Sequence, residues 1–182
     1  MSRSRAVTAF SIVAMCIVAA IAYGIAHDLV TAHVCVEYFT IGHPPVFGTD
    51  SPLLLALGWG VIATWWVGLM LGLVLAFAAV RGARPMRTAR SLLRPVALLL
   101  LVMAVCAALA GGIGYFAGGQ GWVFLLEPLA SRVPSERHVL FLADLWAHSA
   151  SYLVGFVGGL VLAGRVWRSR RAATLGPSAT SP

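Results

Sequence analysis

The sequence contains no lysine, and only 10% of its 182 residues are charged. A soluble globular domain usually has about 25% charged residues. Hydrophobic residue types make up 60% of the chain, and its mean hydropathy is +0.90. Disordered proteins, nucleic-acid-binding domains and disulfide-stabilised secreted domains are excluded, because none of them keeps so much apolar surface away from water. The composition is that of a polytopic membrane protein whose solvent is the lipid bilayer.

Motifs of common enzyme classes are also absent. The chain has no Gly-x-Ser-x-Gly nucleophile elbow, no phosphate-binding loop and no Gly-x-Gly-x-x-Gly fingerprint. Its three cysteines are an odd number. Cys16 and Cys106 lie inside apolar runs, where we expect them to pack as small apolar residues. Cys35 has no cysteine partner outside these runs, so no structural disulfide is expected.

Four apolar runs are each long enough to cross the hydrocarbon core, which requires about 20 helical residues. They cover residues 6–26, 52–80, 95–118 and 139–164. Each run is expected to be a helix, because lipid offers no partner for backbone polar groups. The sequence therefore predicts an all-α polytopic membrane protein, an antiparallel bundle of four transmembrane helices that forms one domain over residues 1–171. Residues 172–182 are expected to be a disordered cytoplasmic tail.

The arginines set the expected orientation. Nearly all of them precede the first run, join the second to the third or follow the fourth, and only Arg132 and Arg137 lie between the third and fourth runs. The positive-inside rule then places both termini in the cytoplasm (N-in/C-in) of a bacterial-type inner membrane. We expect this arginine-rich face to bind anionic lipid headgroups. Every acidic residue and every histidine falls toward the outer side.

The first run has an alternative interpretation as a cleaved signal peptide. Arg3 and Arg5 precede it, and Ala20-Ile21-Ala22 fits a small-x-small cleavage site. The run is longer than the apolar core of a signal peptide, which has about 7–15 residues, so a retained helix is the preferred interpretation. Cleavage would leave three spans and an outer N-terminus.

Small residues indicate where helices pack. Gly68 and Gly72, and likewise Gly155 and Gly159, are small-xxx-small pairs that allow close approach of membrane helices. The glycines near the end of the third run indicate either packing or a loosened helix end. Residues 121–134 are too short and too interrupted by proline to span, so we expect them to lie on the outer surface and to cover the polar residues there.

The fourth run carries ionisable residues within an apolar sequence. At 100° per residue, one stripe contains Asp144, His148, Ser151, Gly155 and Gly159. The other side, expected to face lipid, contains Leu142, Trp146, Leu153, Phe156, Val157 and Leu160. An ionisable pair inside a span is costly and indicates a functional site by default. The alternative is a structural Asp–His hydrogen bond near the interface.

A second polar cluster follows the first run, between His27 and His43. His33 and Glu37 are four residues apart, so they share a face if the helix continues outward or bends at the interface. The turn that begins at Gly42 ends this stretch. An ordinary amphipathic interfacial segment is the alternative interpretation.

The two clusters together predict a metal site. His33, Glu37, Asp144 and His148 are the expected ligands, and His27 and Asp28 are the expected catalytic residues that move protons. Mixed histidine and carboxylate sets suit iron, zinc or manganese. The prediction requires the end of the first helix to reach the outer third of the fourth. A b-type haem is a weaker alternative, because no second histidine lies deep in a run.

Three classes of function are compatible with these features. The preferred one is a metal-dependent membrane enzyme with an outward-facing site, which performs redox or hydrolytic chemistry on a lipid-soluble substrate. A non-catalytic assembly subunit with a membrane protein partner explains the glycines but leaves Asp144 and His148 costly. A transporter or ion-handling protein is disfavoured, because the inner halves of the four runs lack ionisable residues.

Overall fold

A computed structural model of the chain describes residues 3–172, and over this range the protein is helical with no strand. The elements are α1 (Arg3–Val34), α2 (Val36–Thr40), α3 (Pro52–Ile62), α4 (Trp65–Val80), α5 (Ala89–Gly119), α6 (Leu129–Arg132), the 3-10 helix η1 (Ser135–Arg137) and α7 (His138–Ala172). Four helical stretches are long and apolar enough to cross a membrane, which confirms the prediction of four such helices. The expected tail lies outside the described residues from residue 173 onward.

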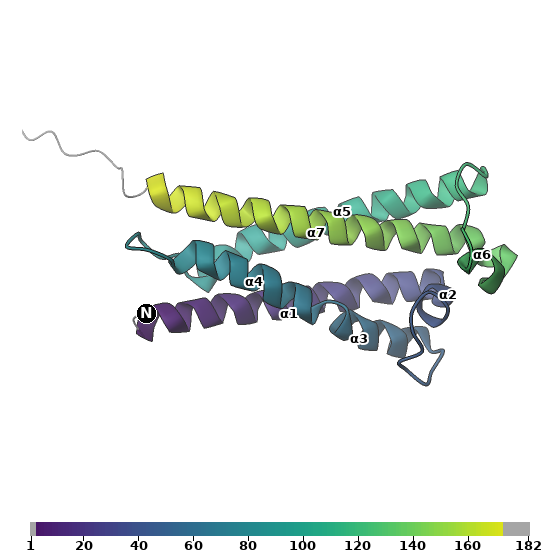
Figure 1. Ribbon diagram of the computed structural model, residues 1–182, viewed down its shortest axis with the longest axis horizontal. Coiled ribbons are helices and arrows are strands. Elements are labelled where there is room, and N and C mark those ends of the chain that lie inside the picture. The colour runs from purple at the N-terminus through teal and green to yellow at the C-terminus, as the bar shows by residue number, and fades with distance from the viewer. Residues whose placement is uncertain (1–2, 173–182) are drawn as a thin grey trace, which may run out of the picture.

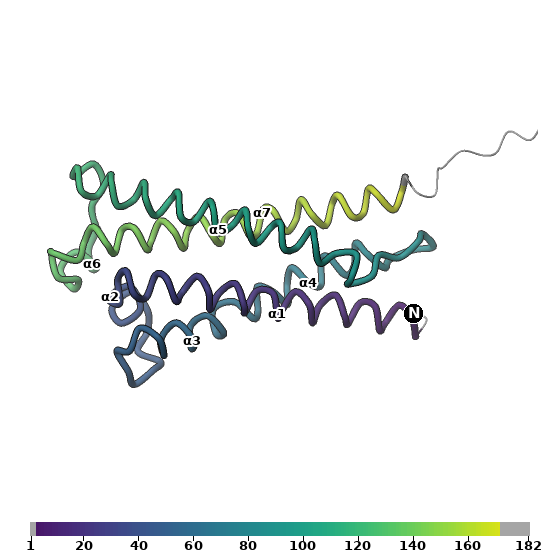
Figure 2. The backbone as a smooth tube through the Cα atoms, turned by 180° about the vertical axis from the view of Figure 1, so that it is seen from behind, coloured from purple at the N-terminus to yellow at the C-terminus, as the bar shows by residue number. Residues whose placement is uncertain are grey.

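The long helices lie side by side. α1 packs against α3 and α4, α5 packs along α7, and α4 also contacts α7 (Figure 1). The start of α1, the α4–α5 loop and the end of α7 lie at one end of the molecule, which we call the arginine end (Figure 2). The opposite end carries α2, α6 and η1, and we call it the loop end.

Helix α1 extends well beyond the predicted end of the first run. It continues without a break to Val34, and Thr31 and Ala32 are buried in its added turns. The backbone becomes extended at Cys35 (φ −146°, ψ 93°) and then starts the short helix α2. Cys35 is itself fully buried, packed with Leu125 and Val133 of the segment before η1. The polar stretch after the first run therefore first continues α1 as far as Val34 and folds back over the molecule only from Cys35 onward.

The second span is interrupted, whereas the sequence predicted one continuous helix. α3 ends at Ile62 and α4 begins at Trp65. The hydroxyl of Thr64 donates to the carbonyl of Gly60 at 2.5 Å, a bond type that bends helices. Gly24 of α1 lies against this bend, where a Cβ atom would come within 3 Å of both Gly60 and Thr64.

Two of the predicted packing positions have a clear structural role. A Cβ atom at Gly68 would lie 2.7 Å from the carbonyl oxygen of Cys16, so α4 meets the backbone of α1 there. Gly114 leaves room on α5 for Leu142 and Trp146 of α7. These two side chains were expected to face lipid, and that expectation was wrong. Leu142 is 5% exposed, because the glycines of α5 allow α7 to come close enough for Leu142 and Trp146 to pack against α5.

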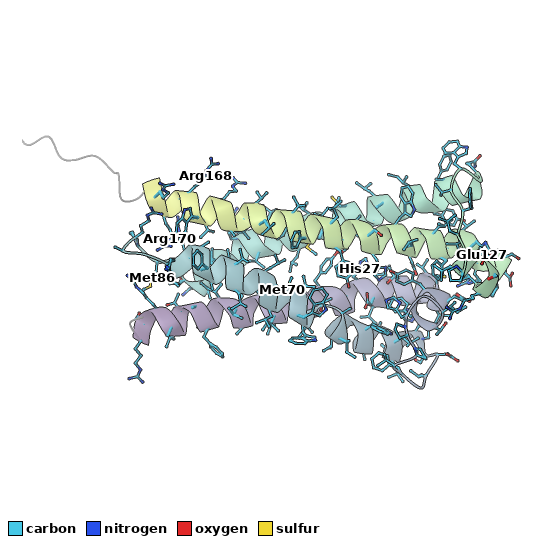
Figure 3. All side chains as sticks on the ribbon, viewed as in Figure 1. His27, Met70, Met86, Glu127, Arg168 and Arg170 are labelled. Carbon is cyan, nitrogen blue, oxygen red and sulfur yellow. The ribbon has the colours of Figure 1, made fainter. Side chains whose placement is uncertain are left out.

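A buried arginine ties the end of α7 to the α4–α5 connection. Arg170 is 1% exposed and has no carboxylate partner among residues 3–172. Its guanidinium points toward the α4–α5 loop in Figure 3. It donates to four backbone carbonyl oxygens, those of Ala78, Arg81, Arg84 and Pro85, at 2.6 to 3.1 Å. Ala78 lies in the last turn of α4 and the other three residues follow it, where the helix offers their carbonyls no donor.

Candidate metal centre

Two histidines and one aspartate from opposite ends of the sequence meet inside the molecule. His27, which is labelled in Figure 3, and Asp28 come from α1, and His148 comes from α7. Their potential ligand atoms all lie within 4.8 Å of one another. Bonds near 2 Å place the ligand atoms around one ion about 3–4 Å apart, so small side-chain rotations bring all three into range. The meeting of helix one with the Asp144–His148 pair therefore occurs through His27 and Asp28.

A backbone hydrogen bond fixes the protonation pattern of His148. Its Nδ1 lies 2.8 Å from the carbonyl oxygen of Asp144, and a carbonyl only accepts, so Nδ1 carries the proton. In the neutral ring Nε2 then holds a lone pair. This atom faces Oδ1 of Asp28 at 3.3 Å. Two acceptors in such contact require a shared proton or a metal ion between them.

His27 completes the group with an unused nitrogen. The rings of His27 and His148 meet edge to face, with centroids 4.5 Å apart. Nε2 of His27 is buried and has no hydrogen-bond partner in the described part of the chain. Buried polar atoms are rarely left unpaired, so this nitrogen is a further point at which a ligand is expected.

Helix α2 covers the group from the loop end. The break at Cys35 turns α2 back so that the ring of Tyr38 stacks on His148, with centroids 4.4 Å apart. Tyr38 also contacts Phe141, and Phe39 lies edge to face with His148. The aromatic cover excludes water from this side and restricts the His148 ring to one orientation.

An internal cavity of about 110 Å³ opens from the group toward the arginine end. Its polar end is lined by Tyr23, His27, Asp28, His148, Ser151 and Tyr152. The hydroxyls of Tyr23 and Ser151 are hydrogen-bonded at 2.7 Å. Its other end is lined by apolar side chains, including Leu75, Leu99 and Leu162. The cavity thus has potential metal ligands at one end and an apolar, hydrocarbon-like lining at the other.

The remaining predicted ligands lie outside this group. His33 is exposed, and its Nδ1 donates to the carbonyl of Leu29. Glu37 accepts from Nε of Arg137 at 2.9 Å, and Arg137 also donates to the carbonyl of Val34. Asp144 is buried near the group, and Oδ2 of its carboxyl has no partner among the described residues. Asp144 is not part of the group of His27, Asp28 and His148, which we call the triad.

The groups around α2 have shifted pKa values. Burial raises the pKa of the Cys35 thiol to about 12, so it stays protonated and donates to Glu37. Burial also pushes the pKa of Glu37 upward, but hydrogen bonds from the backbone, Arg137 and Cys35 outweigh it and leave the pKa below its usual range. Burial lowers the pKa of His43, although its hydrogen bond to the Tyr38 carbonyl opposes this, so His43 packs as a neutral ring.

Sequence reasoning missed the aromatic residues and the arginine that support the group. Tyr23 is four residues before His27, and this spacing on α1 was the available signal for it. Tyr38 and Arg137 had no such signal, because their roles depend on how α2 folds back against the start of α7.

Comparisons with protein-family models, with curated proteins and with solved structures give no match to this chain.

Proposed function

We propose that the protein is a metal-dependent membrane enzyme whose metal is held by His27, Asp28 and His148. The observation that carries this proposal is the 3.3 Å contact between Nε2 of His148 and Oδ1 of Asp28. The unpartnered Nε2 of His27 lies beside them. Two histidines and one carboxylate are the ligand set of non-haem iron oxygenases and of many catalytic zinc sites.

The proposal includes a placement in the membrane. We infer one antiparallel bundle of four transmembrane helices, with both termini in the cytoplasm of a bacterial-type inner membrane. The arginine distribution supports this orientation. The triad then lies in the outer half of the membrane, on the side from which α2 and α6 cover it.

The chain's own residues define what each ligand does. Asp144 orients His148 through its backbone carbonyl, which is the usual way that proteins fix a metal-binding histidine. Asp28 supplies the negative charge that offsets a divalent cation in a buried site. The metal would act as a Lewis acid or as a redox centre, and its identity decides between hydrolytic and redox chemistry. Tyr23 and Ser151 offer hydroxyls to a polar group at the cavity mouth.

The cavity supports a lipid-soluble substrate that carries a chain. Its volume of about 110 Å³ is below that of an engineered cavity that holds one benzene ring, about 150 Å³. A narrow apolar space of this size fits part of an alkyl chain better than a fused ring system. A second groove, of about 470 Å³, runs between α1 and α5 and is lined by His27, Asp144 and Tyr115. Tyr115 is 54% exposed, so we infer that this groove gives access from the bilayer.

Metal analysis of the purified full-length protein tests the proposal. After loading with iron, zinc or manganese and removal of free metal, the wild type should hold about one ion per chain. Asp28→Asn and His148→Gln should lower affinity more than about 100-fold, since each removes a direct ligand. The matched controls are Asp50→Asn and His33→Gln, which change the same residue types at exposed positions outside the triad.

The controls make the result decisive. The proposal predicts that both control variants retain the metal. A wild type without metal, or equal metal content in all five proteins, would contradict it and favour a non-catalytic partner subunit. Loss of metal from the control variants alone would instead point to His33 as a ligand.

A further inference from the structure

A long groove lies on the surface between α5 and α7, toward the arginine end. Its volume is about 1000 Å³. The α5 side includes Leu98 and Val102, and the α7 side includes Leu153, Val157 and Val161. These five side chains are 44–65% exposed, so the groove opens outward to the lipid rather than into the interior.

One end of the groove is strongly basic. Arg87, Arg94 and Arg165 line it together with Ser91 and Ser169. All three arginines are exposed, and a weak hydrogen bond of 3.4 Å joins Arg87 to Ser169. Arg94 and Arg165 form no hydrogen bond or ion pair within the part of the chain that the structure describes.

The sequence supplies no acidic side chain at this end. It has no acidic residue between Asp50 and Glu127, and none after Asp144. Three like charges around one groove repel one another unless an anion lies among them. A phosphate group satisfies arginine through paired, charge-assisted hydrogen bonds.

The length of the groove matches one leaflet of a bilayer. From Arg165 to Leu153 it follows twelve residues of α7, about 18 Å at the rise of an α-helix. One leaflet contributes about half of a hydrocarbon core of about 30 Å. The groove is therefore charged at the depth of the headgroups and apolar along the depth of the acyl chains.

We propose that this groove is a specific binding site for one anionic diacyl glycerophospholipid. The phosphate-bearing headgroup lies among Arg87, Arg94 and Arg165, and one acyl chain follows the apolar floor toward Leu153. None of His27, Asp28 and His148 lines this groove, and its basic end lies at the arginine end of the molecule, so the site does not depend on the proposed metal chemistry.

Native mass spectrometry of the delipidated full-length protein with added lipid tests the headgroup contact. Phosphatidylglycerol should bind at one copy per chain, at least about tenfold more tightly than phosphatidylcholine with the same chains. An arginine near an anionic headgroup increases the affinity about fivefold. The double variant Arg94→Gln/Arg165→Gln should therefore bind phosphatidylglycerol about 30-fold more weakly than the wild type.

The matched control is Arg90→Gln/Arg168→Gln, which removes the same charge from the same two helices. Neither residue lines the groove, and Arg168 extends from α7 away from α1 and α4 in Figure 3. This variant should bind phosphatidylglycerol as the wild type does. Equal losses in both double variants would overturn the proposal, because binding would then reflect net charge alone.

A second pair of variants tests the acyl chain. Val161→Trp fills the groove, and Leu160→Trp places the same ring on an exposed neighbour that does not line it. Only Val161→Trp should lower the affinity for phosphatidylglycerol, by tenfold or more. Glycerol 3-phosphate and inorganic phosphate should bind far more weakly than the lipid. The proposal is overturned if either binds as tightly as the lipid, if both tryptophan variants behave alike, or if Val161→Trp instead dissociates a dimer of the chain.

Discussion

At the scale of single residues, the side chain of His148 is held by contacts on several sides. Its Nδ1 is committed to a backbone carbonyl, its ring is stacked by Tyr38, and its Nε2 faces Asp28. Packing and hydrogen bonding thus hold a lone pair in place beside a carboxylate. Such preorganisation is costly in a folded protein unless a bound group uses it, which is why we assign it to metal binding.

The ion pair that holds α2 in place predicts a dependence on pH. The pKa of Glu37 lies below its ordinary value of 4.5 in the folded protein, so Glu37 stabilises the fold fully above that value. This contribution, at most about 1 kcal/mol, is lost as pH falls through the lowered pKa. Thermal unfolding followed by tryptophan fluorescence should show wild type more stable than Glu37→Gln at pH 6, with the difference vanishing in more acidic buffer.

Arg137→Gln provides the check on this interpretation. It should remove the same pH-dependent difference, and the double variant should resemble either single variant because the two side chains act as one pair. Additive losses in the double variant would show that Glu37 stabilises the fold through other contacts.

Sequence reasoning found part of the candidate site and missed the rest for a physical reason. Asp144 and His148 could be predicted as site residues because they are ionisable side chains within an apolar run. His33 and Glu37 were placed among the ligands because their spacing suits one helix face, but α1 ends at Val34. The contacts of Arg137 across one hundred residues decide where Glu37 lies, and no local pattern encodes them.

At the scale of elements, hydropathy predicted the four membrane-length helices but not the interruptions within them. The break between α3 and α4 depends on the close approach of α1, and the extended residue at Cys35 depends on its burial under Leu125. Both are tertiary effects. The apolar sequence on either side of each break is equally suited to a continuous helix.

The arginine that joins α7 to the α4–α5 loop should contribute strongly to stability. Arg170→Lys keeps the charge, but a lysine cannot reach four carbonyls arranged for a guanidinium. We expect a loss of about 2 kcal/mol or more, since hydrogen bonds to charged groups are worth about 1.5–3 kcal/mol each. Denaturation in mixed micelles measures it. The control Arg168→Lys, at an exposed position, should change stability by less than about 0.5 kcal/mol.

Close approach of α1 and α4 predicts a sharp difference between two glycines. Gly68→Ala places a Cβ atom 2.7 Å from the Cys16 carbonyl oxygen and should cost about 1–3 kcal/mol. Gly112 on α5 has open space around it, so Gly112→Ala should be neutral or stabilising by up to about 1 kcal/mol. The same micelle denaturation compares them. Equal effects would contradict the contact between α1 and α4.

At the scale of the whole molecule, charge is divided between the two ends. Most of the arginines lie in the segments that meet at the arginine end, whereas the acidic residues and the histidines lie in the segments nearer the loop end. In the proposed orientation this division follows the positive-inside rule and leaves the triad toward the outer surface.

Reporter fusions test the orientation. A reporter fused after Arg171 should be active only in the cytoplasm, because both the end of α7 and the start of α1 lie at the arginine end. One inserted near Asp50, between α2 and α3, should be active only outside. A cytoplasmic signal at Asp50 would reverse the proposed orientation of the whole chain.

The central claim is that one metal ion is bound by His27, Asp28 and His148. X-ray absorption spectroscopy at the edge of the metal retained by the purified protein tests it most directly. The account predicts a first shell of nitrogen and oxygen at about 2.0–2.2 Å with the scattering signature of two imidazoles, reduced to one imidazole in His148→Gln that has been saturated with the same metal. A shell without imidazole, or a spectrum that His148→Gln leaves unchanged, would contradict it.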